Sequence, residues 1–316
     1  MHTTGLAVAV IAALSGACAS RLETPPDSFT IGVVSATEYG IVLQPIARLT
    51  KSEWLNTWPT LEETDLIPTL DQIPDTWLDG AVPVTWRFSP PRGPSRDVKV
   101  VNARRGDSVC YAPVELVLEG EGAGAPPENS APAFFGIATS SDVPVAYWVE
   151  VPRQGEEVGR LFAAIDAALR KIERQTVDAF LFPEGLPSPG MLSSEKLQAT
   201  AITKLMRSND DAEGRTYWFD AVRRAHGDQW HQMHGVALEG WVRVERGAEP
   251  VVFGQTGRVR WEMESGARHT PLAIIRHHDR DFWVLRRNYY ESTGYDTTEV
   301  SFPDAFERAK ANGGGC

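Results

Sequence analysis

The spacing of hydrophobic residues changes twice along this chain. Between residues 29 and 151, short β-branched runs alternate with turn-like or proline-rich stretches, which is typical of short strands. From residue 156 to 174 the apolar residues recur at every third or fourth position, as on one face of a helix, and strand-like runs return after His234. This order of strands, helices and strands predicts an α+β fold rather than alternating βαβ units.

Residues 28–151 are predicted to form a β-rich module. Residues 29–34 and 39–47 are β-branched runs, and further runs follow at roughly ten-residue spacing. A proline- and tryptophan-rich passage from Trp54 to Trp86 excludes a long helix and keeps any strand within it short. Several short strands at this spacing favour a sandwich or a barrel-like sheet.

Residues 152–312 are predicted to form a second module that begins with helices. The first helix covers residues 156–174, with acidic residues in its first turn and basic residues near its end, as the helix dipole favours. Further helices are expected near 194–207, 217–225 and 304–311.

The second half of this module is predicted to be an antiparallel sheet. Residues 258–264 alternate between apolar and charged, as in a half-buried strand. Residues 272–276 and 282–287 are expected to pair as a hairpin closed by residues 277–281. Residues 313–316, three glycines and Cys316, are expected to form a flexible tail.

Residues 1–19 have the features of a secretory signal. A short polar start precedes an apolar run from Leu6 to Leu14, which is too short to span a bilayer, and small residues follow it. No Lys or Arg precedes the apolar run, which departs from the usual charged start. The sequence predicts export across the inner membrane of a bacterium, to the periplasm, the outer membrane or the cell surface.

The residues Ser15-Gly16-Ala17-Cys18 resemble the lipobox of bacterial lipoproteins, in which the cysteine becomes the lipid-carrying N-terminus. The match departs from that pattern at Ser15, where a branched aliphatic residue is usual. The resemblance implies lipidation of Cys18 and membrane attachment by this anchor alone, with residues 20–28 as a tether. Residues 17–19 also fit a small-x-small site cut before Ser20, which would release a soluble protein.

Composition and charge limit the partners. The chain has 316 residues, 42% hydrophobic and 23% charged, which suits a folded globular protein. Its net charge of −11 gives it no electrostatic attraction for nucleic acid or anionic headgroups. An envelope protein or a glycan is the expected partner. If Cys18 is lipidated, Cys110 and Cys316 remain as a potential disulfide pair, although a buried Cys110 and a loose thiol at Cys316 fit equally.

His226, His231 and His234 are the best candidates for metal ligands. Imidazole suits zinc, and His231 and His234 are spaced to share one face of a helical turn. The spacing matches no motif of established geometry, and a polar loop with ordinary histidines explains it as well. No cofactor is therefore expected, with zinc as the alternative. Residues 277–281, with two histidines and two aspartates, fit either an acid–base pair or a hairpin tip.

Four tryptophans are crowded into the proline-rich passage: Trp54, Trp58, Trp77 and Trp86. Exposed indole rings on a β scaffold stack on sugars or anchor protein partners, whereas core packing needs no ligand. Two hypotheses follow. The first is a non-catalytic envelope protein that binds a partner or a glycan through this surface. The second is a metal-dependent hydrolase that uses the three histidines.

Replacing Cys18 by alanine tests the lipobox. We expect the wild-type protein to fractionate with membranes and to incorporate labelled palmitate, and C18A to do neither, because the acyl chains are the only anchor. Cys110→Ala is the matched control and should retain the label. An unlipidated wild-type protein whose mass begins at Ser20 would show that the alternative site is cut.

Overall fold

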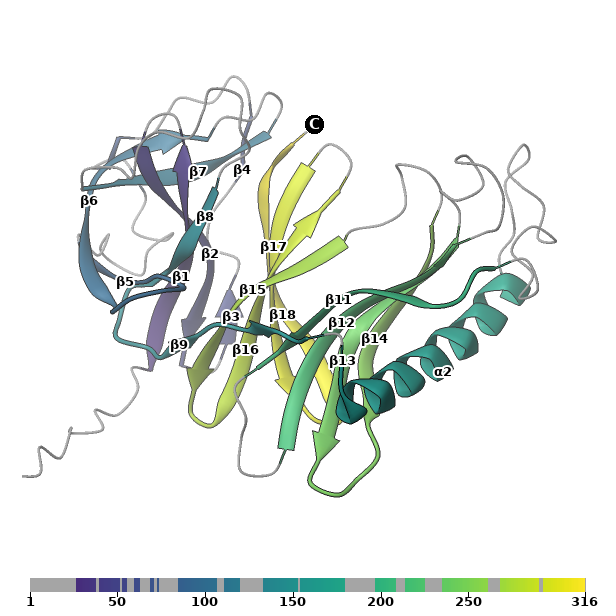
Figure 1. The fold of residues 1–316 in the computed structure, drawn as a ribbon. Helices are drawn as coiled ribbons and strands as arrows, with labels where there is room; N and C mark the ends of the chain where they lie inside the picture. The colour runs from purple at the N-terminus through teal and green to yellow at the C-terminus, as the bar shows by residue number, and fades with distance from the viewer. Residues whose placement is uncertain are drawn as a thin grey trace, which may run out of the picture.

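The computed structural model describes residues 27–37, 40–51, 53–55, 60–62, 69–70, 73, 85–106, 111–119, 133–152, 154–179, 197–208, 214–224, 235–260, 268–289 and 292–315. This part of the chain is mostly β, with one helix (Figure 1). Its strands form two antiparallel sheets, one of thirteen strands and one of five.

The N-terminal part of the large sheet contains a closed ring of six strands. The strands of this part are β1 (Ser28–Thr37), β2 (Gly40–Thr50), β3 (Glu53–Leu55), β4 (Thr60–Glu62), β5 (Thr85–Ser89), β6 (Arg96–Arg105), β7 (Tyr111–Leu118), β8 (Ala133–Thr139) and β9 (Val145–Ala146). Hydrogen bonding runs in the order β2-β1-β8-β5-β6-β7, and β7 pairs with β2 again. Closure leaves these six strands with few free edges, and Leu43, Trp86 and Leu116 fill the interior.

The C-terminal strands continue the same sheet. They are β15 (Arg268–His277), β16 (Arg280–Asn288), β17 (Ser292–Ser301) and β18 (Asp304–Gly315), and each pairs with the next. β18 meets β7 through Gly315 and Tyr111, and β15 pairs with β9. Strands from the two ends of the chain therefore share one hydrogen-bonded sheet. The module boundary predicted at residue 151 stays a prediction.

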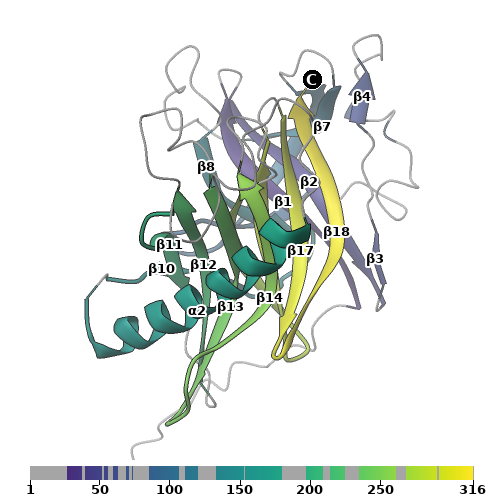
Figure 2. The ribbon, with the colours of Figure 1, turned by 90° about the vertical axis from the view of Figure 1, so that its right-hand side faces the viewer.

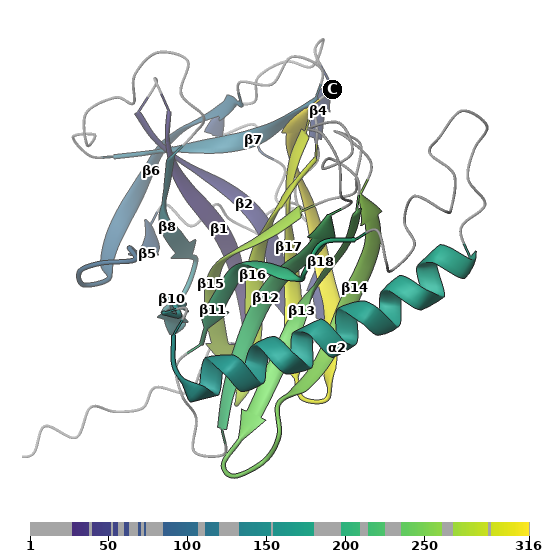
Figure 3. The same ribbon diagram turned by 45° about the vertical axis from the view of Figure 1, so that its right-hand side comes forward.

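The five-stranded sheet carries the helix. It contains β10 (Val149–Glu150), β11 (Ala201–Arg207), β12 (Gly214–Arg224), β13 (Gly235–Glu245) and β14 (Val251–Arg260), in that order. Helix α2 (Glu156–Ala179) lies diagonally across β12, β13 and β14 (Figures 2 and 3). Leu161, Ile165 and Leu169 pack against this sheet. A buried ion pair between Glu173 and Arg223 also links α2 to β12.

The elements stack in layers, which Figure 1 shows side by side. Helix α2 covers one face of the five-stranded sheet, and the other face packs on β15–β18 through Trp218, Trp241 and Trp283. The far face of β15–β18 packs on β1 and β2 through residues such as Phe282 and Ile31. Both β13 and β16 are thus covered on both faces.

The predicted helix over residues 156–174 is confirmed, because α2 buries the apolar face that the periodicity defines. The helix predicted over residues 217–225 is wrong, since that segment lies in β12 up to Arg224. Tyr217 and Phe219 face α2 whereas Trp218 faces β15–β18, so a strand covered on both faces reads as one apolar run without alternation.

Two further helix predictions are also wrong. Residues 201–207, within the second predicted helix, form β11. Residues 304–311 have a helix-favouring composition, but they belong to β18 and pair with β17 along its length. Pairing with a neighbouring strand overrides a weak intrinsic preference. The expected tail glycines at 313–315 are the end of β18 rather than a separate segment.

The predicted hairpin is confirmed. His277 pairs with Arg280, and His278 and Asp279 form the turn with positive φ angles of 47° and 60°. A two-residue turn with both residues in this region matches the twist of the strands that it connects. The predicted strand 258–264 begins within β14, and residues 261–264 lie outside the described residues.

Candidate functional site

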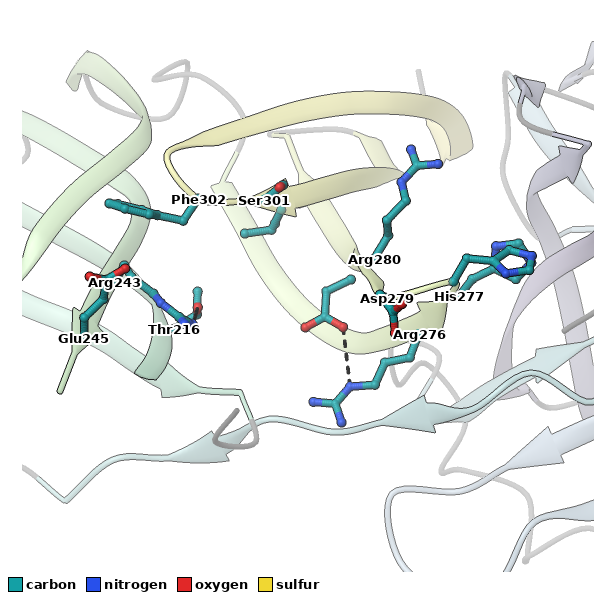
Figure 4. Close-up of a pocket in the computed structure, with 12 residues that line it drawn as sticks. Thr216, Arg243, Glu245, Arg276, His277, Asp279, Arg280, Ser301 and Phe302 are labelled. Carbon is teal, nitrogen blue, oxygen red and sulfur yellow. Dashed lines mark hydrogen bonds and ion pairs between the residues drawn. The ribbon is translucent and has the colours of Figure 1, made fainter. Parts of the chain in front are cut away.

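A groove of about 640 Å³ lies where the ends of the two sheets meet (Figure 4). One side is formed by Thr216 on β12 and by Arg243 and Glu245 on β13. The other side is formed by the β15–β16 turn and by Val300, Ser301 and Phe302 at the β17–β18 turn. The groove therefore depends on three hairpins that are separate in sequence: β13–β14, β15–β16 and β17–β18.

The histidines of the turn pack in aromatic contacts. His277 is buried, and its ring packs on Phe29 with centroids 5.2 Å apart and on His278 with centroids 4.1 Å apart. Asp279 is exposed in the turn. The hairpin-tip interpretation of residues 277–281 accounts for these positions.

The arginines that line the groove are held in place by neighbours. Arg276 forms an ion pair with Asp281, with 3.4 Å between Nε and Oδ1. Arg280 donates two hydrogen bonds to Glu299, of which Nε to Oε1 is 2.7 Å. The hydrogen bond from Arg280 is the largest cause of a lowered pKa at Glu299. Arg243 donates from Nη1 to Oγ1 of Thr216 over 3.1 Å.

The groove is polar but electrically balanced. Its lining contains three arginines and three carboxylates, those of Glu245, Asp279 and Asp281. At its edge the ring of Phe302 is 40% exposed and is fixed by an edge-on contact with Phe253, with centroids 5.4 Å apart. The surface thus offers hydrogen-bond donors, acceptors and one oriented aromatic face.

A second polar cluster lies between the two sheets and is centred on His269 at the start of β15. Its Nδ1 lies 2.5 Å from Oε1 of Glu239 on β13, and its Nε2 lies 2.7 Å from Oδ2 of Asp296 on β17. Arg287 donates to the other oxygen of Asp296. A small cavity of about 140 Å³ adjoins this cluster.

His269 acts here as a charged link rather than as a base. Burial by itself lowers the pKa of His269, but the hydrogen bonds with Asp296 and Glu239 outweigh burial and raise the pKa to about 9. With both ring nitrogens engaged by carboxylates, neither is free to accept a proton from a substrate. The imidazolium therefore ties the five-stranded sheet to β15–β18.

Of the tryptophans predicted to form a binding surface, two are described and both pack in the interior. Trp86 is fully buried inside the ring, and Trp54 packs between Phe29 and Phe282. This placement agrees with the core-packing alternative for these two side chains. Trp58 and Trp77 lie outside the described residues.

The remaining predicted site residues also lie outside the described residues: Cys18, Cys110, Cys316, His226, His231 and His234. Within the described part of the chain, no group of three or more His, Cys, Asp and Glu side chains is placed to hold a metal ion. No described helix combines the length and the apolar character needed to cross a membrane.

Sequence reasoning missed most of the groove. It singled out residues 277–281, but Arg243, Glu245 and Phe302 carry no local motif. An aromatic residue beside Pro303 in a short polar stretch, Ser301 to Asp304, is a turn signal, and that signal could have located the third hairpin.

The charge on His269 makes stability depend on pH. Because its folded pKa of about 9 exceeds the unfolded value of 6.5, the stabilisation is fully present below about pH 6.5 and is lost as the pH rises through about 9. The shift is worth at most about 3 kcal/mol for this mostly buried group. We expect the melting temperature of the wild type to fall between pH 7 and 9.5, and that of His269→Gln to be lower and nearly flat. Parallel curves for the two proteins would contradict this role.

The register of β7 and β18 bears on the predicted disulfide. Tyr111 and Gly315, the described neighbours of Cys110 and Cys316, are paired across these strands. We expect protein recovered from an oxidising compartment to yield a Cys110–Cys316 peptide pair under non-reducing digestion, because these two cysteines remain to pair there if Cys18 is lipidated. Quantitative alkylation of both thiols without reductant would show that the bond is absent.

The function must be argued from the residues of this chain. Comparisons with protein-family models, with curated proteins and with solved structures each found no match.

Proposed function

We propose that this protein is an exported bacterial envelope protein that binds a glycan and performs no catalysis of its own. The groove between Arg243 and the β15–β16 turn is the proposed binding site. The observation that carries the proposal is the combination of balanced charge with a fixed, exposed aromatic ring at Phe302.

The balance of charge favours a neutral, hydroxyl-rich ligand. A sugar hydroxyl both donates and accepts, so it is best satisfied where guanidinium donors and carboxylate acceptors lie side by side. Arg276 beside Asp281 is such a pair, and Arg243 beside the Thr216 hydroxyl offers a further donor next to a group that both donates and accepts. An anionic ligand would gain little here, because the lining holds as many carboxylates as arginines.

The aromatic ring supplies the apolar contact that sugars need. The C–H face of a pyranose packs on an exposed aromatic face, and a ring that is already fixed loses little entropy on binding. Phe302 is held by Phe253, and Ser301 beside it lines the same groove. The groove is also in the size range of small-ligand sites.

Export and lipid attachment through Cys18 belong to the same proposal, and both rest on the sequence. A partner protein of the envelope is the other expected class of ligand. The metal-dependent hydrolase remains the second hypothesis from the sequence, with its three histidines outside the described residues.

Replacing Phe302 by alanine tests the proposal. We would screen neutral oligosaccharides and uronic-acid counterparts of equal length, and measure affinity by calorimetry. We expect a neutral oligosaccharide to bind the wild type and to bind F302A about tenfold more weakly, which corresponds to about 1.4 kcal/mol.

Phe306→Ala is the matched control. Phe306 is similarly exposed, at 46%, and lies in the adjacent strand β18 without lining the groove. F306A should bind as the wild type does. Equal loss in the two variants, preference for the uronic acids, or no binding of any oligosaccharide would each count against a glycan in this groove.

A further inference from the structure

A second cavity, of about 220 Å³, lies between the N-terminal ring and the C-terminal strands. Its lining comes from both: Val33 and Val42 from β1 and β2, and Leu272, Arg286 and Tyr295 from β15, β16 and β17. No residue of the groove contributes to it. The two sites are therefore separate.

Arg286 is the unusual residue of this cavity. Among the arginines that the structure describes as buried or half-buried, it is the one without a hydrogen bond or an ion pair to a described residue. Its Nε is buried and has no hydrogen-bond partner. Its sequence neighbour Arg287, by contrast, is paired with Asp296 on the opposite face of the strand. The buried Nε thus has a hydrogen-bonding capacity that no described residue satisfies.

The other charges nearby do not compensate Arg286. Glu115 also lines the cavity, but its Oε2 is 3.1 Å from Nε of Arg104, and both side chains are largely buried. Burial is the largest cause of the lowered pKa of Lys204, and the carboxylates of Asp220 and Glu239 act on it alongside Arg286 and Arg268, so the wider surroundings are of mixed charge. Within the lining, Arg286 is the cation without a paired carboxylate among the described residues.

The lining combines polar and apolar side chains. Arg286 and Tyr295 are direct cross-strand partners. The Tyr295 hydroxyl makes no hydrogen bond with a described residue, and burial raises its pKa to about 12, so it remains a neutral donor. Val33, Val42 and Leu272 form an apolar wall and are each nearly inaccessible to solvent. This is the pattern of a site for an amphipathic small molecule.

We propose that this cavity binds a small organic carboxylate with a short apolar tail. The carboxylate accepts hydrogen bonds from the Arg286 guanidinium and the Tyr295 hydroxyl, and the tail lies along Val33, Val42 and Leu272. A guanidinium recognises a carboxylate with two parallel hydrogen bonds, which compensates the buried cation. The cavity has the volume of roughly seven water molecules, which restricts the tail to a few carbon atoms.

The experiment is a calorimetric titration with acetate, butyrate and hexanoate, and with the alcohols of the same chain lengths. For the wild type we expect carboxylate affinity to rise with chain length until the tail no longer fits, and the alcohols to bind more weakly. In Arg286→Met the carboxylate affinity should fall on the order of tenfold while alcohol binding is unchanged.

Arg268→Met is the matched control, because Arg268 is exposed, contributes a similar charge nearby and does not line the cavity. It should leave carboxylate binding unchanged. Arg286→Lys keeps the charge and should retain part of the affinity if Arg286→Met fails to fold. Val33→Ala should extend the longest accepted chain.

Three results would overturn the proposal: no carboxylate binding to the wild type, equal affinity in Arg286→Met, or equal losses in Arg286→Met and Arg268→Met. Oligosaccharide binding to the groove is measured in a separate titration of the same variants. Failure of glycan binding therefore leaves this inference intact, and failure of carboxylate binding leaves the groove intact.

Discussion

The contact between the five-stranded sheet and strands β15–β18 is the constraint on which the groove depends. Trp241 and Trp283 meet edge to face across this interface, with centroids 6.2 Å apart, in a cluster that also contains Trp218. His269 adds a charged link between carboxylates on the two sheets. Since the groove lies where these sheets end, a shift between them would separate Arg243 from the β15–β16 turn.

Buried carboxylates and guanidinium groups are paired with each other in several parts of the described structure, and Arg286 is an exception. Glu173 with Arg223, Asp296 with Arg287 and Glu299 with Arg280 are each paired at close range. Such pairs cost much of their attraction in lost hydration, but breaking one leaves an uncompensated charge. Arg286 stands outside this scheme within an amphipathic cavity, and a bound anion would restore the balance that the rest of the core maintains.

Local pattern predicted well where one element has one buried face or one turn type. Helix α2 shows its apolar stripe because only one side packs on the sheet, and the β15–β16 hairpin is marked by its turn. It failed for β12, where both faces are covered, and for β18, whose composition favours a helix. In both cases pairing with another strand supplied the hydrogen bonds that decided the conformation: β13 for β12, and β17 for β18.

The sequence by itself determined the strand-rich first part, the helix over residues 156–174, the β15–β16 hairpin and the acidic charge, because periodicity and composition are local properties. The tertiary structure alone decided that β15–β18 share a sheet with β1–β9, and that Arg243, Phe302 and residues 276–281 line one groove. The same holds for the link at His269 and for the half-buried position of Arg286 in its cavity. These features join residues far apart in the chain, and long-range pairing leaves no period in the sequence from which it can be read.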